Sequence, residues 1–337
     1  MNKTLASTSA LKTSPSARKT SPKKEEGLFG IAVPDIAALV ALRHGARQLS
    51  LFPRRQAMAA TAGNYRSRFR GRGMDFDEVR PYQPGDDIRT IDWRVTARTT
   101  KTHTKVFREE RERPVVIAVD LRSSMFFGSR RLKSLVAAEI ATTLAWAGLR
   151  ANDRIGGMIF SPEQQRDLRS RRSHHNVLQF IHSLSAACEE LLDFGDDKLS
   201  LTQVFEDIRR AVSPGTSVVI ISDFHGLDHE GEKQLFQLVR HCDLSLACVR
   251  DPLETALPPP GIYRVSDGVN QQQLHTGDSK IRAHFHNTQL RQQQLLEAVS
   301  TRIGAGLMSF STKDPVLPEL MKHYSSRNSH HRGRRGR

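Results

Sequence analysis

The run from Pro114 to Asp120, PVVIAVD, constrains the fold of this chain more than any other stretch. Its β-branched residues do not alternate with polar ones, which predicts a strand buried on both faces of a parallel sheet. A second apolar run, from Ser217 to Phe224, carries Asp223 near its end. Parallel strands end at the same edge of a sheet, where open α/β sheets bind their ligands. We therefore expect Asp120 and Asp223 to share one rim.

Strands and helices alternate over the rest of this region, which is typical of a doubly wound, mostly parallel α/β sheet. Helices are expected where apolar residues recur at helical spacing, over residues 131–149, 176–187, 201–212, 232–241 and 288–302. Further strands are expected over 154–160, 244–250 and 306–310, with a polar edge strand over 164–171 and β character within 252–274. We assign residues 114–312 to this domain.

Two segments precede a second candidate module. Residues 1–26 are rich in Ser, Thr, Lys and Pro, which predicts disorder. Residues 27–64 contain an amphipathic helix between Val33 and Phe52, entered through Pro34, and then a linker. We expect this helix to dock on the protein's own body, and pairing with a partner's helix is the alternative.

Residues 65–113 interleave arginines with acids around the turn signal PGDD at residues 84–87. Short strand-like pieces around this turn and over Thr104 to Glu110 predict a small β-rich module; the residues in the first pieces are Val79, Tyr82, Ile88, Ile91, Trp93 and Val95. The interleaved carboxylates favour a salt-bridged surface or protein interface over a nucleic-acid groove. The candidate interface residues are Arg80, Asp86, Asp87, Arg89, Asp92, Trp93 and Arg98.

The net charge of +15 raises the question of nucleic-acid binding, so its location matters. Residues 1–26 carry a net charge of +4, and residues 322–337, within an expected basic C-terminal tail over 313–337, carry +6. Basic tails can neutralise phosphates, which makes a nucleic-acid-associated protein the alternative function. Solvated ends that aid solubility are the simpler interpretation.

The composition indicates a cytoplasmic protein with a sizeable core. Hydrophobic residues make up 38% of the chain, but no apolar run approaches the length of a membrane span and the N-terminus lacks the apolar segment of a signal peptide. Three cysteines without CxxC spacing argue against a disulfide framework or a zinc cluster. We expect Cys188, Cys242 and Cys248 to be small core residues.

The loop after Asp120 is polar and contains Arg122, Ser123 and Ser124. Oxygen ligands from Asp120, Ser124 and Asp223 would suit a hard cation such as Mg²⁺. The alternative is that each carboxylate only caps its own turn.

A strand ending at Asp120, an Ala-rich helix, and a later strand ending in Ser-Asp form a pattern that resembles the von Willebrand factor A fold and its metal-ion-dependent adhesion site. The first loop of that site reads Asp-x-Ser-x-Ser, and Asp120 and Ser124 match its outer positions, while Asp223 matches the later aspartate. Arg122 replaces the middle serine, and no threonine stands at 199 or 200, where the family places one. A guanidinium between the two carboxylates would pair with them and repel a divalent cation. We therefore expect no cofactor, or weak Mg²⁺ binding at a degenerate site.

The stretch Gly71 to Arg98, together with KVFREERE and DRIGGMIF, is similar to the bacterial family called domain of unknown function 58. The resemblance covers Leu28 to Phe310. It implies a β-rich segment joined to a von Willebrand A-like domain. It also implies partnership with a MoxR-type AAA+ ATPase in chaperone-like assembly or maturation of protein complexes.

Common catalytic motifs are missing from the sequence: there is no phosphate-binding Gly-x-x-x-x-Gly-Lys loop, Gly-x-Ser-x-Gly elbow or His-Glu-x-x-His helix. A metal-dependent enzyme built on Asp120, Asp223 and His225 is a third hypothesis. We predict a non-enzymatic interaction module whose rim contacts a carboxylate or amide of a protein partner. The rim residues are Asp120, Arg122, Ser123, Ser124 and Asp223.

Overall fold

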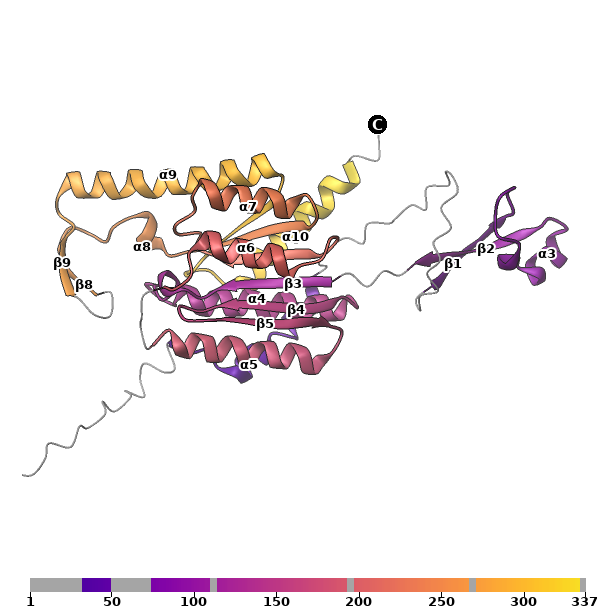
Figure 1. Cartoon of the computed structure of the whole chain (residues 1–337), viewed down its shortest axis with the longest axis horizontal. Helices are drawn as coiled ribbons and strands as arrows, with labels where there is room; N and C mark the ends of the chain where they lie inside the picture. Colours follow the sequence, from indigo (N-terminus) through magenta and orange to yellow (C-terminus); the bar gives the residue numbers. More distant parts are fainter. Residues whose placement is uncertain (1–31, 50–73, 110–113, 193–196, 267–270, 334–337) are drawn as a thin grey trace, which may run out of the picture.

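A computed structural model describes residues 32–49, 74–109, 114–192, 197–266 and 271–333 of the chain (Figure 1). The expected disordered segment 1–26 and most of the predicted linker up to residue 64 lie outside these ranges. The described residues form a small module between residues 74 and 109 and an α/β body that includes residues 114–192. The body contains the predicted rim.

The centre of the body is a six-stranded sheet with the order β10-β7-β6-β3-β4-β5. Its strands are β3 (Pro114–Asp120), β4 (Arg154–Phe160), β5 (Gln165–Arg171), β6 (Ser217–Ser222), β7 (Asp243–Arg250) and β10 (Gly306–Ser311). All neighbouring pairs are parallel except β4 with β5, so the predicted mostly parallel sheet is confirmed. The edge strand predicted over residues 164–171 is confirmed as β5. After β3 the chain adds β4 and β5 on one side of it and then β6, β7 and β10 on the other side. The boundary between β3 and β6 is therefore the topological switch point.

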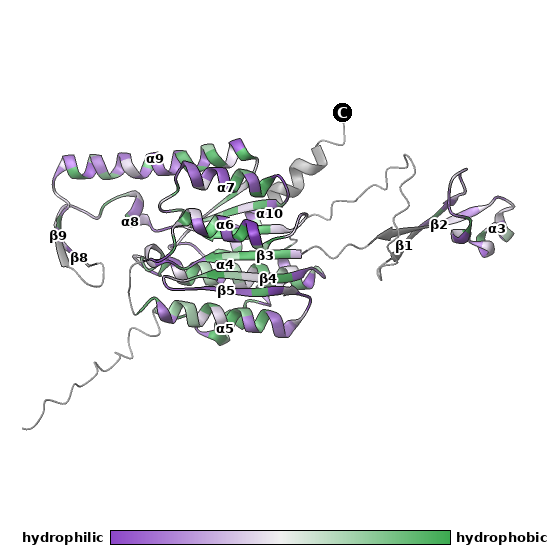
Figure 2. Ribbon diagram, viewed as in Figure 1, coloured by the Kyte–Doolittle hydropathy of each residue, from purple (hydrophilic) through white to green (hydrophobic). Residues whose placement is uncertain are grey.

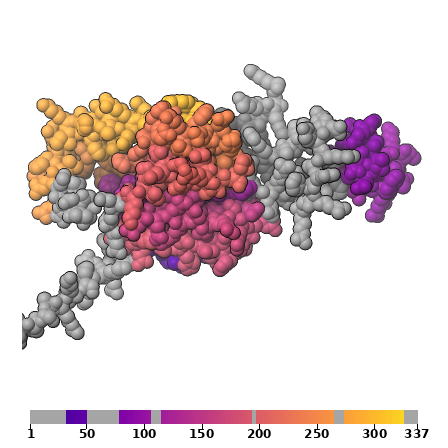
Figure 3. Space-filling view, in the orientation of Figure 1, coloured from indigo at the N-terminus to yellow at the C-terminus, as the bar shows by residue number. Residues whose placement is uncertain are grey.

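Helices cover both faces of this sheet (Figure 2). Alternate residues of β3 pack into two cores: Val115, Ile117 and Val119 face one, and Ala118 faces the other. The first core includes residues of α4 (Lys133–Arg150) and α5 (His174–Glu190). The second includes residues of α6 (Leu201–Ala211), α7 (His229–Val239) and α9 (Ser279–Ile303). In the space-filling view α9 lies along one border of the body (Figure 3).

The N-terminal helix docks on the body, as expected, but it is broken into two turns. These are α2 (Ile36–Ala41), capped by Asp35, and the 3₁₀ turn η1 (Gly45–Gln48). Leu39 is 2% exposed, and α2 contacts both α4 and α5. The apolar face predicted from the sequence is therefore covered by the protein itself.

The expected basic tail over residues 313–337 is wrong for residues 316–333, which form helix α10 (Val316–Gly333). Val316, Leu320 and Tyr324 recur every four residues and are buried in the core that contains α4. This spacing places their side chains on one face of a helix. Burial of that stripe favours a docked helix, despite the positive charges that follow it in the sequence.

Replacing Leu320 with alanine should therefore lower the free energy of unfolding by about 2–5 kcal/mol, because Leu320 is fully buried and a cavity would remain. Urea unfolding followed by circular dichroism measures the change. The matched control is Lys322→Ala, since the Lys322 side chain is 75% exposed. A loss for Leu320→Ala no larger than the control's would contradict the docking of α10.

The small module is a hairpin of β1 (Met74–Pro81) and β2 (His103–Glu109), joined through the 3₁₀ turn η2 (Ile88–Thr90) and helix α3 (Trp93–Thr99). The strand predicted over Thr104 to Glu110 is confirmed as β2. The strand-like pieces predicted at Ile88, Trp93 and Val95 are wrong. Asp92 starts a helix instead, because its carboxylate accepts hydrogen bonds from the backbone N–H groups of Arg94 (3.0 Å) and Val95 (3.2 Å).

Between β7 and α9 the region predicted to have β character begins with the short helix α8 (Pro252–Thr255). It continues with an antiparallel hairpin of β8 (Ile262–Ser266) and β9 (Gln271–His275). Helix α9 begins nine residues before the predicted start because Asp278 caps it, accepting a hydrogen bond from Lys280 N at 2.8 Å. Cys188, Cys242 and Cys248 are free and buried, as expected of core residues. Among the described residues, no helix combines the length and apolar character needed to cross a membrane.

Candidate functional site

The rim begins with Asp120, the last residue of β3, which is 1% exposed. Arg122 folds back onto it in a bidentate pair: Nε lies 2.9 Å from Oδ1 and Nη2 lies 2.9 Å from Oδ2. The Ser222 hydroxyl, at the end of β6, donates to Oδ2 at 2.7 Å. Asp120 is thus neutralised and hydrogen-bonded by its own chain.

Asp223, which directly follows β6, has a different cation. Lys133, in the first turn of α4, places its Nζ 2.7 Å from Asp223 Oδ2 and also hydrogen-bonds Glu254 Oε1. Burial acts to raise the pKa of Asp223, but the Lys133 ammonium, together with hydrogen bonds from the backbone N–H of His225 and from Ser124, outweighs it and the pKa is lowered. Burial likewise acts to lower the pKa of Lys133, and the two carboxylates outweigh it and raise that pKa.

The predicted sharing of Arg122 by both aspartates is therefore wrong. Arg122 makes hydrogen bonds with Asp120 and only a longer-range attraction to Asp223. The reason is geometric: the Arg122 guanidinium is held by both carboxylate oxygens of Asp120, so the Asp223 carboxylate pairs with another cation. Lys133, which is 1% exposed, is the cation that pairs with Asp223.

Sequence reasoning missed Lys133, Glu254 and Asp197. One signal was available for Lys133, since a lysine in the first turn of a helix is disfavoured by the helix dipole and needs a compensating partner. Asp197 accepts hydrogen bonds from the backbone N–H (2.9 Å) and hydroxyl (2.7 Å) of Ser123. The predicted rim residue Ser123 is therefore held by a third carboxylate.

Glu254 is positioned by another buried carboxylate, that of Asp251, which is 1% exposed. Asp251 accepts from the backbone N–H of Ser129 at 2.7 Å, from the Ser129 hydroxyl at 2.9 Å and from the hydroxyl of Thr312. It also caps α8, and Glu254 Oε2 accepts from Asp251 N at 2.9 Å. These contacts tie the loop before α4 to the ends of β7 and β10.

The predicted metal ligands Asp120, Ser124 and Asp223 do come together at the switch point, but they do not fit a divalent cation. Both carboxylates are already paired with an internal cation, and a metal would have to displace it. Ser124 lies beside Asp223 and helps to lower the pKa of that carboxyl. Within the described residues, no group of three or more His, Cys, Asp and Glu side chains is placed to hold a metal.

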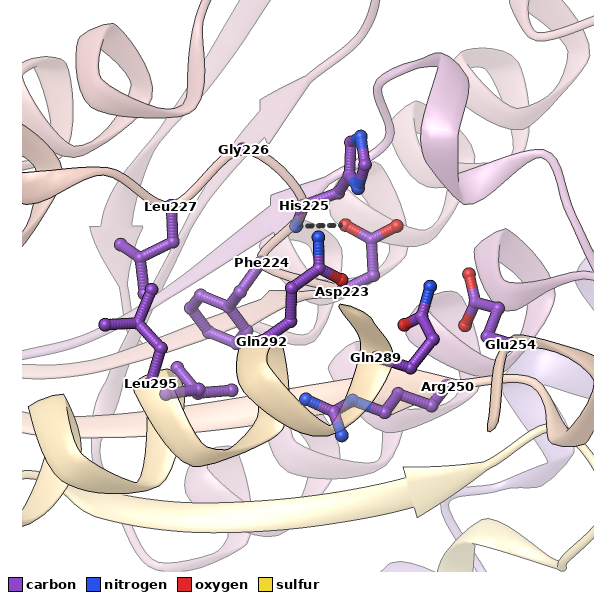
Figure 4. A pocket seen from close by; sticks show the side chains of 11 residues that line it. Asp223, Phe224, His225, Gly226, Leu227, Arg250, Glu254, Gln289, Gln292 and Leu295 are labelled. Atoms are coloured by element: carbon purple, nitrogen blue, oxygen red, sulfur yellow. Dashed lines mark hydrogen bonds between the residues drawn. The ribbon is translucent and has the colours of Figure 1, made fainter. Parts of the chain in front are cut away.

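A pocket of about 120 Å³ opens beside Asp223, over the ends of β6 and β7 (Figure 4). Its polar lining comes from Asp223, His225, Arg250, Glu254, Gln289 and Gln292. The apolar wall is formed by Phe224, Leu227, Leu295 and Leu296. Phe224 has a φ of 56° and Gly226 a φ of 82°, so the chain turns sharply after Asp223 and leaves His225 exposed.

The burial of Asp120, Arg122 and Asp223 changes the interpretation of the rim. The Asp223 side chain is 5% exposed, so these three groups support the crevice from inside. The opening at this rim is the pocket beside Asp223. In the hypothesised enzyme site of Asp120, Asp223 and His225, both aspartates are held in ion pairs, so neither is a free carboxylate base.

The predicted interface residues of the small module divide into two groups. Asp86 pairs with Arg80 at 2.7 Å, Asp87 caps η2, and Asp92 caps α3 and lies 3.5 Å from Lys105 Nζ. These three acids therefore form ion pairs and helix caps within the module. Arg89, Trp93 and Arg98 are exposed on its surface.

The strand order and the ion-paired rim at the switch point define a doubly wound α/β protein. The chain belongs to the family described as protein of unknown function DUF58, whose model matches residues 78–295. The family predicted from Gly71 to Arg98 is thus confirmed.

Relatives of this chain include uncharacterized proteins of Mycobacterium tuberculosis and Mycobacterium bovis, each 28% identical over 290 residues, which is 83% of this chain and 88% of the relative. Similar solved structures include the conserved hypothetical protein BatB of Bacteroides thetaiotaomicron, at 14% identity and a TM-score of 0.39 over 64% of this chain and 98% of that one. An aerotolerance-related membrane protein of Bacteroides fragilis matches at 12% identity and a TM-score of 0.41, over 64% and 99% of the two chains. The von Willebrand A domain of SpRpn10 matches at 12% identity and a TM-score of 0.34, over 62% and 94%.

Proposed function

We propose that this chain is a non-enzymatic protein-interaction module that receives a carboxylate or amide side chain of a partner in the pocket beside Asp223. The observation that supports this is the lining of the pocket. Arg250, Gln289 and Gln292 present hydrogen-bond donors beside two carboxylates, Asp223 and Glu254, that both accept hydrogen bonds from Lys133. The apolar wall adds contact area around such a side chain.

The partner we propose is a MoxR-type AAA+ ATPase in the cytoplasm, acting with this chain in chaperone-like assembly or maturation of protein complexes. Membership of the DUF58 family supports this proposal through the resemblance described above. A binding role is also consistent with a rim whose charges are satisfied internally, because such a rim offers a fixed shape and no reactive group.

Co-purification of the chain with the AAA+ ATPase of its native host tests the proposal. The double substitution Gln289→Glu with Gln292→Glu should weaken binding at least about tenfold, because it places two carboxylates where donors stood. The matched control is Gln294→Glu, an exposed glutamine of the same helix outside the pocket lining. Binding of the double variant at the control's affinity would refute the pocket, and failure to recover the ATPase with the wild type would refute the partner.

A further inference from the structure

The small module carries a surface that the pocket does not involve. We name it the Trp93 face and define it by the exposed residues Ile88, Arg89, Trp93, Arg94, Ala97 and Arg98. Trp93 is 68% exposed and Ile88 is 67% exposed, whereas the other tryptophan, Trp146, is 7% exposed. Large apolar side chains at this exposure are typical of contact sites for other molecules.

Two acids of the module, Asp86 and Asp92, do not balance the charge of this face because they are used within the module. Asp92 accepts from two backbone N–H groups of α3, and Asp86 is paired with Arg80. Within the described residues, Arg89, Arg94 and Arg98 form no ion pair and are exposed. An exposed tryptophan therefore stands among three arginines whose charge has no partner in this part of the chain.

The face is also rigidly held on the hairpin. The Thr90 and Thr104 hydroxyl groups lie 2.6 Å apart, and Ile91 forms a bridge with Thr104 of β2. The backbone N–H of His103 donates to the Thr96 hydroxyl of α3 at 3.0 Å. A surface fixed in this way loses little conformational entropy when it binds.

We propose that the Trp93 face binds an acidic segment of a protein partner that also carries aliphatic side chains. The arginine charges favour carboxylates, and Trp93, Ile88 and Ala97 offer an apolar surface between them. The single exposed aromatic ring suits a peptide better than a nucleic-acid strand, whose successive bases stack on successive rings. This binding site goes beyond the proposed pocket and does not depend on it.

Fluorescence anisotropy on the full chain tests the proposal with three labelled probes: a peptide of alternating Glu and Leu pairs, the same peptide with Lys in place of Glu, and an oligothymidylate. We expect the acidic peptide to bind at least about tenfold more tightly than either other probe. Trp93→Ala, and Arg94→Glu with Arg98→Glu, should each weaken its binding at least about tenfold. Phe236→Ala, which removes an aromatic ring that is 52% exposed on α7, should leave it unchanged.

Two results would overturn the proposal. One is an acidic peptide that binds the Trp93 and arginine variants as tightly as the wild type, or does not bind the wild type. The other is tighter binding of the oligothymidylate, which would assign the face to nucleic acid. Urea unfolding of each variant verifies that the loss of binding occurs in a folded protein, and Arg94→Lys with Arg98→Lys should retain most of the affinity because it keeps the charge.

Discussion

Replacing Lys133 with methionine is expected to lower the free energy of unfolding by about 3–5 kcal/mol at neutral pH. Lys133 is the buried cation that hydrogen-bonds both Asp223 and Glu254. Methionine fills a similar volume, so the loss reports the charge and not a cavity. The Asp223 side chain, 5% exposed, would be left as an uncompensated charge in the interior.

The same substitution should change the pH dependence. In the wild type, the pKa of Asp223 is lowered from its usual 3.8, so its contribution is present above pH 3.8 and is lost as the pH falls through the folded value. The pKa of Lys133 is raised from 10.5, so its contribution is present below pH 10.5 and is lost as the pH rises through the folded value. Without Lys133, burial should raise the pKa of Asp223, so lowering the pH should recover stability in the variant. The difference between the two proteins should therefore narrow toward pH 4.

Urea unfolding over this pH range measures both effects. Lys233→Met is the matched control, because Lys233 pairs with Glu230 at 2.8 Å on the surface and its side chain is 54% exposed. A surface pair contributes little, so the control should change stability by less than about 1 kcal/mol. Adding Asp223→Asn and Glu254→Gln to Lys133→Met should recover part of the loss. Equal effects of the two lysine substitutions would contradict the buried ion-pair network.

Replacing Arg122 with serine is expected to exchange an internal cation for a metal site. The substitution frees Asp120 from its bidentate partner and restores a hydroxyl at the position where the von Willebrand A site has one. Without metal, both Arg122→Ser and Arg122→Ala should lose about 3–5 kcal/mol, because Asp120 is 1% exposed and loses its counter-charge. Mn²⁺ should then stabilise the serine variant more than the alanine variant, since only serine offers an additional oxygen ligand.

Calorimetric titration with Mn²⁺ and Mg²⁺, combined with thermal unfolding at increasing metal concentration, measures this gain. The alanine variant is the matched control for loss of the arginine alone. Micromolar affinity in the wild type would contradict the view that Arg122 and Lys133 take the place of a cation. An identical metal response of the two variants would show that the site lacks the remaining ligands.

Several elements of the site could be predicted from local pattern. The runs before Asp120 and Asp223 identified the two central strands, because short β-branched runs without polar alternation are typical of a strand covered on both faces. The departure at Arg122 indicated an internal cation in place of a metal. The prediction that Arg122 neutralises both aspartates was half right, since Arg122 forms an ion pair with Asp120 and not with Asp223.

Other elements could not be predicted in this way. The C-terminal charges masked the apolar stripe of α10, and the caps supplied by Asp92 and Asp278 set helix starts that periodicity placed elsewhere. Arg89 and Arg98 were predicted to be interface residues from the sequence. Which acids could balance their charge depended on capping geometry, since Asp87 and Asp92 cap η2 and α3.

The sequence by itself determined the doubly wound sheet and the rim at which Asp120 and Asp223 meet, because these follow from periodicity and from where strands end. It indicated the family through the resemblance carried by Gly71 to Arg98. Only the tertiary structure decided how the charges at that rim are paired. Lys133 lies 90 residues from Asp223 and 121 from Glu254 along the chain. Coulomb attraction and desolvation depend on distance in space and on burial, and neither is encoded in local spacing.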